Sequence, residues 1–335
     1  MNPLQGIRAT KPAYYPDQSI YAEYACGVLG LDFTEIDHGT GLAFTVGGRG
    51  RTVAFGAGRG SFFPQNSATA ATLSNDKYLA DVVMARAGVA TLGGCYFFLH
   101  ERYRAHRPPG HERADATAYL HDLGGTAFLK PLAGSRGDFA QPVEGDAALR
   151  AYLDEVSRHY DAVLMQPVVE GREYRIFLLD GEVLYAARKM PPVLVGDGVQ
   201  TIGELLGSDA VALAQRGISA APGAVDAALL GRILPDGASW RIPGRMNRSA
   251  GGSMHFADPD HADAAFDVAR RAATALGLRA AGVDLFTDIA DDPADIRVIE
   301  VNANPSIRFL EDSGRDDLIV RIWRHTFTSI GLLDV

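Results

Sequence analysis

The stretch between His261 and Asn302 constrains the fold more than any other part of the sequence. Apolar residues recur every three or four positions from Ala262 to Leu276, which predicts an amphipathic helix that ends at Gly277. Two apolar runs follow, Gly282–Phe286 and Ile296–Asn302, and an acidic turn separates them, as in a pair of neighbouring strands. A helix followed by paired strands predicts a chain of the α/β or α+β class, in which helices pack on sheets.

Polar side chains interrupt the second of these runs. Alternate residues of a strand share a face, so we expect Val298, Glu300 and Asn302 to point the same way, with the last two about 7 Å apart. Asp284, in the neighbouring strand, adds a third side-chain oxygen. Such oxygen ligands suit Mg²⁺ ions that bridge nucleotide phosphates. The alternative is a row of polar residues facing water, but an acid inside an apolar strand needs a partner, which favours the metal site.

Composition and charge exclude several classes of protein. The chain has 335 residues, enough for two or three structural units, and 41 acidic against 32 basic residues, a formal net charge of −9. Nonspecific nucleic-acid binding requires a basic surface, so no nucleic-acid partner is expected. The two cysteines suit neither a disulfide framework nor a zinc site. Because we find no signal peptide and no apolar run of about 18 residues, we expect a cytoplasmic protein without a membrane partner.

The middle of the chain contains a candidate phosphate-binding segment. Asn75-Asp76 can cap a helix that runs from Tyr78 to Ala87. The run Thr126–Pro131 predicts a short buried strand that contains Lys130 and leads into a glycine-rich loop, Gly134–Gly137. A lysine and exposed backbone N–H groups at such a loop can contact phosphate. On its own, the pattern favours an ordinary strand and loop.

The next two predicted strands, Ala162–Val169 and Tyr174–Leu179, could enclose an adenine base. Backbone groups of Met165–Val168 would contact the base edge, and the carboxylate of Glu173 would accept hydrogen bonds from the ribose. An ordinary hairpin with charged residues on its surface explains this segment equally well by itself. Arg188-Lys189 follows a further strand-like run, and Arg175 also lies in such a run. Cations at these positions could neutralise charge on a reacting phosphate.

The order of these segments resembles the ATP-grasp superfamily. The resemblance covers about residues 74–310 and is greatest for the ATP-grasp module of cyanophycin synthetases and of glutathione-synthetase-like bifunctional ligases. It rests on Asp76-Lys77, FLKPLAGSRG (128–137), Glu173, AARKMPP (186–192), GDGVQTIGELL (196–206), NRSAGG (247–252), GVDLF (282–286) and VIEVNANPSIR (298–308). The sequence departs from the family pattern at Gln166, where glutamate is usual, at Ser306, where glycine is usual, and at Phe309-Leu310, where Met-His is usual.

The resemblance implies an ATP-grasp fold with ATP between a central and a C-terminal subdomain. The expected units are a small N-terminal α/β subdomain at residues 1–73, the central subdomain at 74–164 and the C-terminal subdomain at 165–335. The ATP-binding residues implied are Lys77, Lys130, Gly134, Ser135, Arg136, Gly137, Met165, Gln166, Pro167, Val168 and Glu173. The Mg²⁺ ligands implied are Asp284, Glu300 and Asn302, and the catalytic residues implied are Arg188, Asn247 and Arg308.

The same resemblance implies an ATP-dependent carboxylate–amine ligase. Such an enzyme forms an amide or peptide bond through an acyl-phosphate and releases ADP and phosphate. Its cofactors would be ATP and one or two Mg²⁺ ions, with Mn²⁺ as a substitute, and its substrates an acid and an amine of amino-acid or small-peptide type. Homodimers are common among related ligases. Two alternatives stay open: a small-molecule kinase of the same fold, and a nucleotide-binding protein without turnover.

Overall fold

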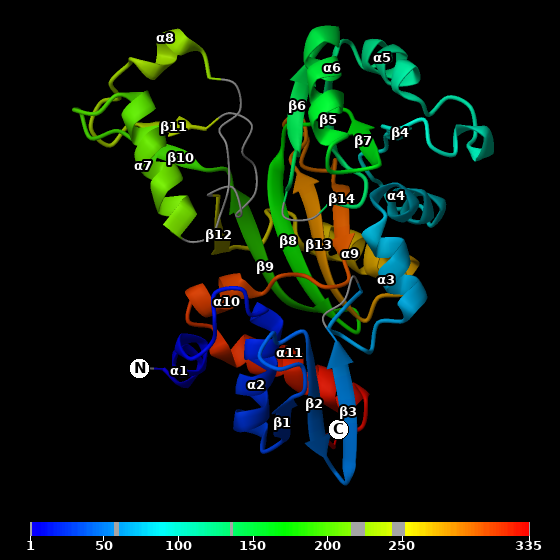
Figure 1. Cartoon of the computed structure of the whole chain (residues 1–335), viewed down its shortest axis with the longest axis vertical. Coiled ribbons are helices and arrows are strands. Elements are labelled where there is room, and N and C mark those ends of the chain that lie inside the picture. Colours follow the sequence, from blue (N-terminus) through cyan, green and yellow to red (C-terminus); the bar gives the residue numbers. More distant parts are fainter. Residues whose placement is uncertain (1, 57–59, 135–136, 216–224, 243–251, 335) are drawn as a thin grey trace.

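The computed structural model describes residues 2–56, 60–134, 137–215, 225–242 and 252–334 of the chain. Its elements form a base, a middle sheet that stands on the base, and two upper lobes (Figure 1). None of the helices in these ranges combines the length and the apolar composition that crossing a membrane requires. The predicted division of the chain at residues 73 and 164 stays a prediction.

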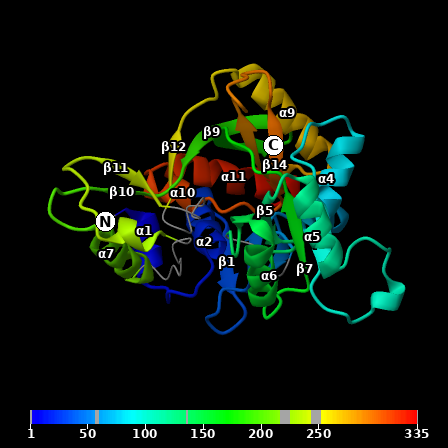
Figure 2. The same cartoon turned by 90° about the horizontal axis from the view of Figure 1, so that it is seen from above.

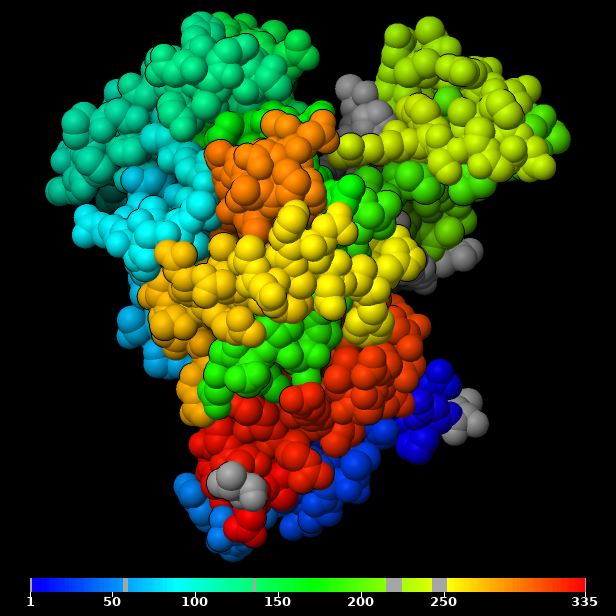
Figure 3. Space-filling model, turned by 180° about the vertical axis from the view of Figure 1, so that it is seen from behind, coloured from blue at the N-terminus to red at the C-terminus, as the bar shows by residue number. Residues whose placement is uncertain are grey.

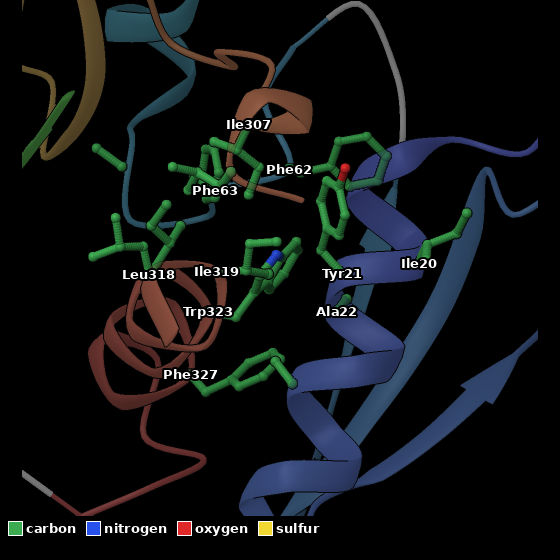
Figure 4. Close-up of a cluster of buried hydrophobic side chains, with 14 of the residues drawn as sticks. Ile20, Tyr21, Ala22, Phe62, Phe63, Ile307, Leu318, Ile319, Trp323 and Phe327 are labelled. Atoms are coloured by element: carbon green, nitrogen blue, oxygen red, sulfur yellow. The ribbon is translucent and has the colours of Figure 1, made fainter. Parts of the chain in front are cut away.

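The base joins segments from opposite ends of the sequence. The first segment supplies α1 (Pro3–Ala9), α2 (Asp17–Leu29) and an antiparallel sheet of β1 (Asp32–Glu35), β2 (Ala43–Gly48) and β3 (Arg51–Gly56). The last segment supplies α10 (Arg308–Asp312) and α11 (Asp316–Ser329). α11 packs along α2, and Tyr21, Phe63 and Trp323 meet in the fully buried core between them (Figure 4). The N-terminal unit expected from the sequence is therefore completed by the last helix.

The middle sheet is antiparallel, with the strand order β12-β9-β8-β13-β14. Its strands are β8 (Arg172–Leu179), β9 (Glu182–Met190), β12 (Ser253–Phe256), β13 (Ala280–Thr287) and β14 (Arg297–Asn302). The sequence Asp180-Gly181, which is typical of hairpin turns, joins β8 to β9, and both residues have positive φ, 47° and 81°, as a two-residue hairpin turn requires.

The two faces of the middle sheet have different partners. One face packs on α9 (Ala262–Ala275), the helix predicted from the apolar stripe, with α3 (Ala68–Asn75) and α4 (Lys77–Arg86) beside it. Figure 2 shows α9 and α11 on opposite sides of these strands, and Figure 3 shows the surface of the α9 side. On the other face, Phe177 and Tyr185 pack into the base, whereas the strand ends farther from the base carry charged side chains.

The first upper lobe is a four-stranded antiparallel sheet with two helices on one face. Its strand order is β4-β7-β5-β6, and its elements are β4 (Cys95–Phe98), η1 (Arg104–His106), α5 (Arg113–Asp122), β5 (Thr126–Pro131), β6 (Gln141–Glu144), α6 (Gly145–Val156) and β7 (Ala162–Gln166). Leu129 and Met165 pack against α5 and α6. The strand predicted to reach Val169 ends at Gln166, because Pro167 has no N–H to donate to a neighbouring strand.

The second upper lobe is an insertion between β9 and β12. It contains β10 (Val193–Val195), α7 (Ile202–Gln215), α8 (Ala227–Leu230) and β11 (Ser239–Arg241), and it has its own small apolar core. The motif GDGVQTIGELL builds this lobe. Asp197 accepts hydrogen bonds from the N–H groups of Val199 and Gln200, while Thr201 and Glu204 cap the start of α7 reciprocally. This segment of the resemblance therefore forms a turn and the capped start of a helix.

Two β-bulges alter the faces of the middle sheet. Between β8 and β9, Phe177 pairs with Tyr185 but Leu178 pairs with Val183, so one extra residue lies in β9. Between β13 and β14, Asp284 pairs with Glu300 but Leu285 pairs with Val298, so Ile299 is extra. The expectation that Val298 shares a face with Glu300 is therefore wrong. Val298 packs with Val301 in the core beneath α9.

Candidate active site

A row of charged side chains crosses the open half of the middle sheet. The strand register places Arg175 of β8, Asp284 of β13 and Glu300 of β14 directly beside one another. Glu173 and Lys189 extend the row along β8 and β9. Because cross-strand partners point to the same side of a sheet, all five side chains lie on the face opposite α9. This row forms one wall of the candidate site, and we call it the acidic wall.

Two cations neutralise the most buried acid of this wall. Asp284 is only 1% exposed, and both of its oxygens accept hydrogen bonds from Arg175 at 2.7 Å. Lys189 Nζ lies 2.7 Å from Asp284 Oδ2 and 2.6 Å from Glu173 Oε1. Burial opposes the charge of Asp284, but the two cations outweigh it and hold the pKa of this carboxyl well below its usual range.

The remaining acids differ in their charge balance. Burial raises the pKa of Glu173, and Lys189 offsets this only in part because Asp284 and Glu300 also face it. Burial and Asp284 act to raise the pKa of Glu300, but Lys77, Lys130 and Lys189 reverse the balance, and the net direction is downward. These lysines therefore favour the ionised form of Glu300. Its Oε1 accepts a hydrogen bond from Asn302 Nδ2 at 3.2 Å.

The side chains of the acidic wall and the neighbouring Asn302 can be compared with the ligands that a magnesium ion requires. No group of three His, Cys, Asp or Glu side chains suited to a metal ion occurs in the described ranges. An ionised carboxylate and a neighbouring amide, Glu300 and Asn302, are oxygen ligands of the kind that Mg²⁺ prefers. Asp284 already accepts hydrogen bonds from Arg175 and Lys189, so a metal ion would have to share its oxygens with these two cations. The donor set fits a magnesium ion that takes its other ligands from a bound phosphate chain and water.

The opposite wall carries lysines from the first upper lobe. Lys130 of β5 lies beside Leu164, on the face of the sheet that α5 and α6 do not cover, and is 6% exposed. Burial lowers the pKa of Lys130 to about 8, although Glu300, Asp81 and Glu173 act in the opposite direction. A buried ammonium that faces acids from another sheet requires the two walls to be close. The charges therefore place the face of β5–β7 that carries Lys130 opposite the acidic wall, and we call the region between these two surfaces the cleft.

Lys77 enters this cleft from the start of α4. Asp76 caps the helix by accepting hydrogen bonds from the N–H groups of Tyr78 and Leu79, at 3.0 and 2.9 Å, and this sets the direction of Lys77. Lys77 Nζ donates to the carbonyl of Gly134 at 2.5 Å. This hydrogen bond connects Lys77 to the start of the glycine-rich loop. Gly137 has φ of 74°, a value that favours glycine.

The segment predicted to hold adenine follows at the end of β7. The side chain of Met165 is buried against α5 and α6, so that residue can offer only backbone groups to the cleft. Gln166 points to the cleft side, where its Nε2 donates to the carbonyl of Gly93 at 2.7 Å. Its Oε1 is buried and has no hydrogen-bond partner among the described residues. Pro167 is half-buried and Val168 is 45% exposed.

Comparison with known proteins identifies the fold. No family model matches the chain. Cyanophycin synthetase of Trichormus variabilis is 28% identical over 202 residues, which cover 54% of this chain and 22% of that protein. The glutathione biosynthesis bifunctional protein GshAB of Streptococcus agalactiae is 27% identical over 271 residues, 69% of this chain and 34% of that protein. The chain thus spans about a fifth to a third of the length of these relatives.

Two solved structures of ligases share the fold of this chain. The bifunctional glutathione synthetase from Pasteurella multocida superposes on 95% of this chain and 44% of its own, with a TM-score of 0.54 and 16% identity. D-alanine–D-alanine ligase from Bacillus anthracis superposes on 79% of this chain and 72% of its own, with a TM-score of 0.51 and 12% identity. The chain has the ATP-grasp fold. The fold class predicted from the sequence is confirmed, and the curated relatives include those that the resemblance named.

Within the ATP-grasp fold, eight of the seventeen predicted site residues meet at the cleft between the two sheets. Those described there are Lys77, Lys130, Gly134, Gln166, Glu173, Asp284, Glu300 and Asn302. Ser135, Arg136 and Asn247 lie outside the described residues. The binding roles assigned to the whole set stay predictions.

Arg188 and Arg308 are not brought into this group. Arg188 pairs with Tyr174, whose ring is buried beneath α9, so Arg188 points away from the acidic wall. The bulge in β9 is the cause, because an unbroken hairpin would place Arg188, rather than Lys189, opposite Glu173. Arg308 begins α10 in the base and lies 3.2 Å from Asp17 and 3.0 Å from Asp312.

Three further residues lie at the ATP-grasp cleft, and two of them, Arg175 and Lys189, were predicted from the sequence as cations that could neutralise a reacting phosphate. Strand alternation places Arg175 on the face of Glu173, two positions earlier. The position of the bulge is needed to place Lys189, and not Arg188, on that face. Gly93, whose carbonyl holds Gln166, lies 73 residues earlier in the chain, and no local pattern connects the two.

Proposed function

We propose that this protein is an ATP-dependent carboxylate–amine ligase that forms an amide or peptide bond through an acyl-phosphate. One observation carries the proposal: Lys77 and Lys130 on one wall of the cleft both face Glu300 on the other, and Lys130 also faces Glu173. A triphosphate between these walls would meet cations on one side and metal ligands on the other, as phosphoryl transfer requires. The named relatives, cyanophycin synthetase and the glutathione-forming proteins, support the same class of reaction.

The reaction proposed has two balanced steps. A carboxylate oxygen of the acid attacks the γ-phosphorus of ATP, which yields an acyl-phosphate and ADP. An amine nitrogen then attacks the acyl carbon, phosphate leaves, and the amine loses a proton. Bound Mg²⁺ would neutralise negative charge on the phosphates.

The side chains of the cleft have separate roles in this proposal. Lys77 and Lys130 bind the phosphates from the side opposite the acidic wall, and Glu173 orients the ribose. Arg175 and Lys189 place positive charge beside the reacting phosphate, so that this charge is already in position when the transition state forms. Glu300 and Asn302 hold the metal. The two sheets exclude water, which would otherwise hydrolyse the acyl-phosphate.

The test is a substrate screen. Purified protein is mixed with ATP, Mg²⁺ and a panel of amino acids and short peptides, singly and in pairs, and ADP, phosphate and product masses are measured. We expect ADP and phosphate only when an acid and an amine are both present, with a product lighter than their sum by one water. A phosphorylated product from a single substrate would instead identify a kinase. ATP binding without turnover across the panel would support a nucleotide-binding protein without catalysis.

A further inference from the structure

The acidic wall continues into an apolar surface at the edge of the middle sheet. In the edge strand β12, Phe256 pairs with Ala187 of β9, and Ala187 pairs in turn with Arg175 of the acidic wall. Met254 pairs with Lys189, which belongs to the same wall. Because cross-strand partners point to the same side of a sheet, Met254 and Phe256 lie on the face that carries the acidic wall. Neighbouring strands are about 5 Å apart, so this apolar edge lies about 5–10 Å from the two cations of the wall.

Two buried aromatic rings support Phe256. The ring centroid of Phe309 in α10 lies 4.6 Å from that of Phe256, and the ring of Tyr185 in β9 lies 5.8 Å away in an edge-on arrangement. Phe309 and Tyr185 are 6% and 7% exposed, whereas Phe256 is 40% exposed and Met254 is half-buried. Figure 1 shows α10 next to β12, as these ring contacts require. We call these four residues the apolar shelf.

The cations that border the apolar shelf are already paired. Lys189 donates to two carboxylates of the acidic wall, at 2.6 and 2.7 Å. The guanidinium of Arg315 lies 5.4 Å from the ring centroid of Phe256 and donates to both oxygens of Asp317, at 2.8 and 2.7 Å. A polar group on the shelf would lose its water without gaining either cation, whereas an apolar group gains free energy by leaving water. The apolar shelf therefore suits an apolar ligand group.

We propose that the apolar shelf holds the side chain of the carboxylic acid substrate, so that the acid is an amino acid or peptide whose reacting residue is apolar. The inference rests on the proposed function, because it requires the carboxylate of the acid to meet the reacting phosphate beside Arg175 and Lys189. From that position the shelf lies one to two strand spacings away, a distance that an amino-acid side chain spans. Phe256 and Met254 thus determine which acid binds and take no part in the chemical step.

The experiment traps the acyl-phosphate with hydroxylamine, so that it does not depend on the identity of the amine substrate. The hydroxylamine nitrogen attacks the acyl carbon, phosphate leaves, a proton is lost from nitrogen, and the hydroxamate formed is measured as its coloured iron(III) complex. The full chain is mixed with ATP, Mg²⁺, hydroxylamine and one acid at a time. The acids are alanine, leucine and aspartate, and glycyl peptides that end in each of them, in both L and D forms.

For the natural chain we expect leucine to exceed alanine in kcat/KM. Leucine extends the side chain of alanine by an isopropyl group, and the shelf covers one side of that group. The ratio should therefore be about 4- to 12-fold, which corresponds to about 0.8–1.5 kcal/mol, half the contribution of full burial. Aspartate should give the lowest value, because its second carboxylate would lose water on the shelf.

Three substitutions localise the effect. Phe256→Ser removes the exposed ring, so the ratio of leucine to alanine should fall to about 2 or less. Phe256→Leu keeps an apolar side chain and should keep the ratio of the natural chain. Tyr103→Ala removes an aromatic ring that is 69% exposed in the first upper lobe, and it should leave the ratio unchanged. Because the readout is a ratio within each variant, a moderate loss of folded protein does not affect it.

The outcomes are distinguishable. A natural chain that uses leucine and alanine equally, or that prefers aspartate, would overturn this inference and leave the acyl-phosphate chemistry standing. A preference for leucine that Phe256→Ser does not reduce would overturn the assignment to the shelf. Failure of every acid to give a hydroxamate would overturn the proposed function, and this inference with it.

Discussion

Replacing Lys189 by methionine tests which cation serves the acidic wall. The substitution keeps an unbranched side chain and removes two charge-assisted hydrogen bonds, to Glu173 at 2.6 Å and to Asp284 at 2.7 Å. Breaking a buried ion pair costs about 3–5 kcal/mol. We expect the lower end of this range, because Arg175 still holds Asp284 and because Glu173, whose pKa is already raised, can take up a proton.

The same substitution should have a larger effect on turnover. If Lys189 stabilises charge on the reacting phosphate, its loss should lower kcat about 10²- to 10³-fold, or about 3–4 kcal/mol of transition-state stabilisation. The assay is phosphate release with the acid and amine found in the screen. Stability is measured in parallel by urea unfolding, so that loss of fold and loss of catalysis can be separated.

Arg188→Met is the matched control for this prediction. It is the same type of change at the next residue, on the other face of β9, and it should alter the free energy of unfolding by no more than about 0.5 kcal/mol. Its kcat should stay near that of the natural chain. If Arg188→Met lost activity while Lys189→Met kept it, the register of β8 and β9 argued above would be refuted.

Four further changes test other parts of the structure. Glu300→Ala should lower kcat by more than the 10- to 100-fold typical of groups that only support a metal ligand, while circular dichroism stays unchanged. The pKa of Lys130 lies below the 10.5 of a free lysine, so the unfolded chain binds more protons between about pH 8 and this value, and the free energy of unfolding should rise with pH across that window. Lys130→Met should remove this rise. Asp76→Ala deletes the cap of α4 and should cost about 1 kcal/mol in urea unfolding. Trp323→Ala, in the core between α2 and α11, should cost about 3–5 kcal/mol.

Each of these predictions has an outcome that would contradict it. Near-normal turnover of Glu300→Ala would remove Glu300 from the metal site. A stability that does not change between pH 8 and 10 would mean that Lys130 is solvated in the folded chain. An unfolding midpoint of Asp76→Ala equal to that of the natural chain would show that the cap contributes nothing, and a loss below about 1 kcal/mol for Trp323→Ala would show that the core rearranges around it.

Local sequence patterns were sufficient for the separate pieces of the fold. The helix α9 follows from its apolar stripe and from Gly277, and the β8–β9 hairpin follows from Asp180-Gly181, because both depend on residues close together in sequence. The motif VIEVN likewise predicted that Glu300 and Asn302 share one face of β14, and Asn302 Nδ2 donates to Glu300 Oε1 at 3.2 Å.

The parts that were missed depend on interactions that no short segment contains. A bulge moves every later side chain of a strand to the opposite face, and the extra residue in β9 is why Lys189 occupies the place expected for Arg188. The hydrogen bond between Gln166 and Gly93 joins β7 to a loop that precedes β4. Such contacts follow from the tertiary structure as a whole, and alternation along one strand does not predict them.

The packing of α11 along α2 has a consequence for how the protein is made. α2 cannot bury Tyr21 against Trp323 until the ribosome has added roughly 300 more residues, which takes about 15–60 s at the usual rates of synthesis. During that interval the apolar side of α2 lacks its final partner, while the upper lobes, whose cores are assembled from nearby segments, can already form. α2 leaves the ribosome long before α11 and is therefore among the last elements to reach its native contacts, and it is where we expect chaperones to bind the nascent protein.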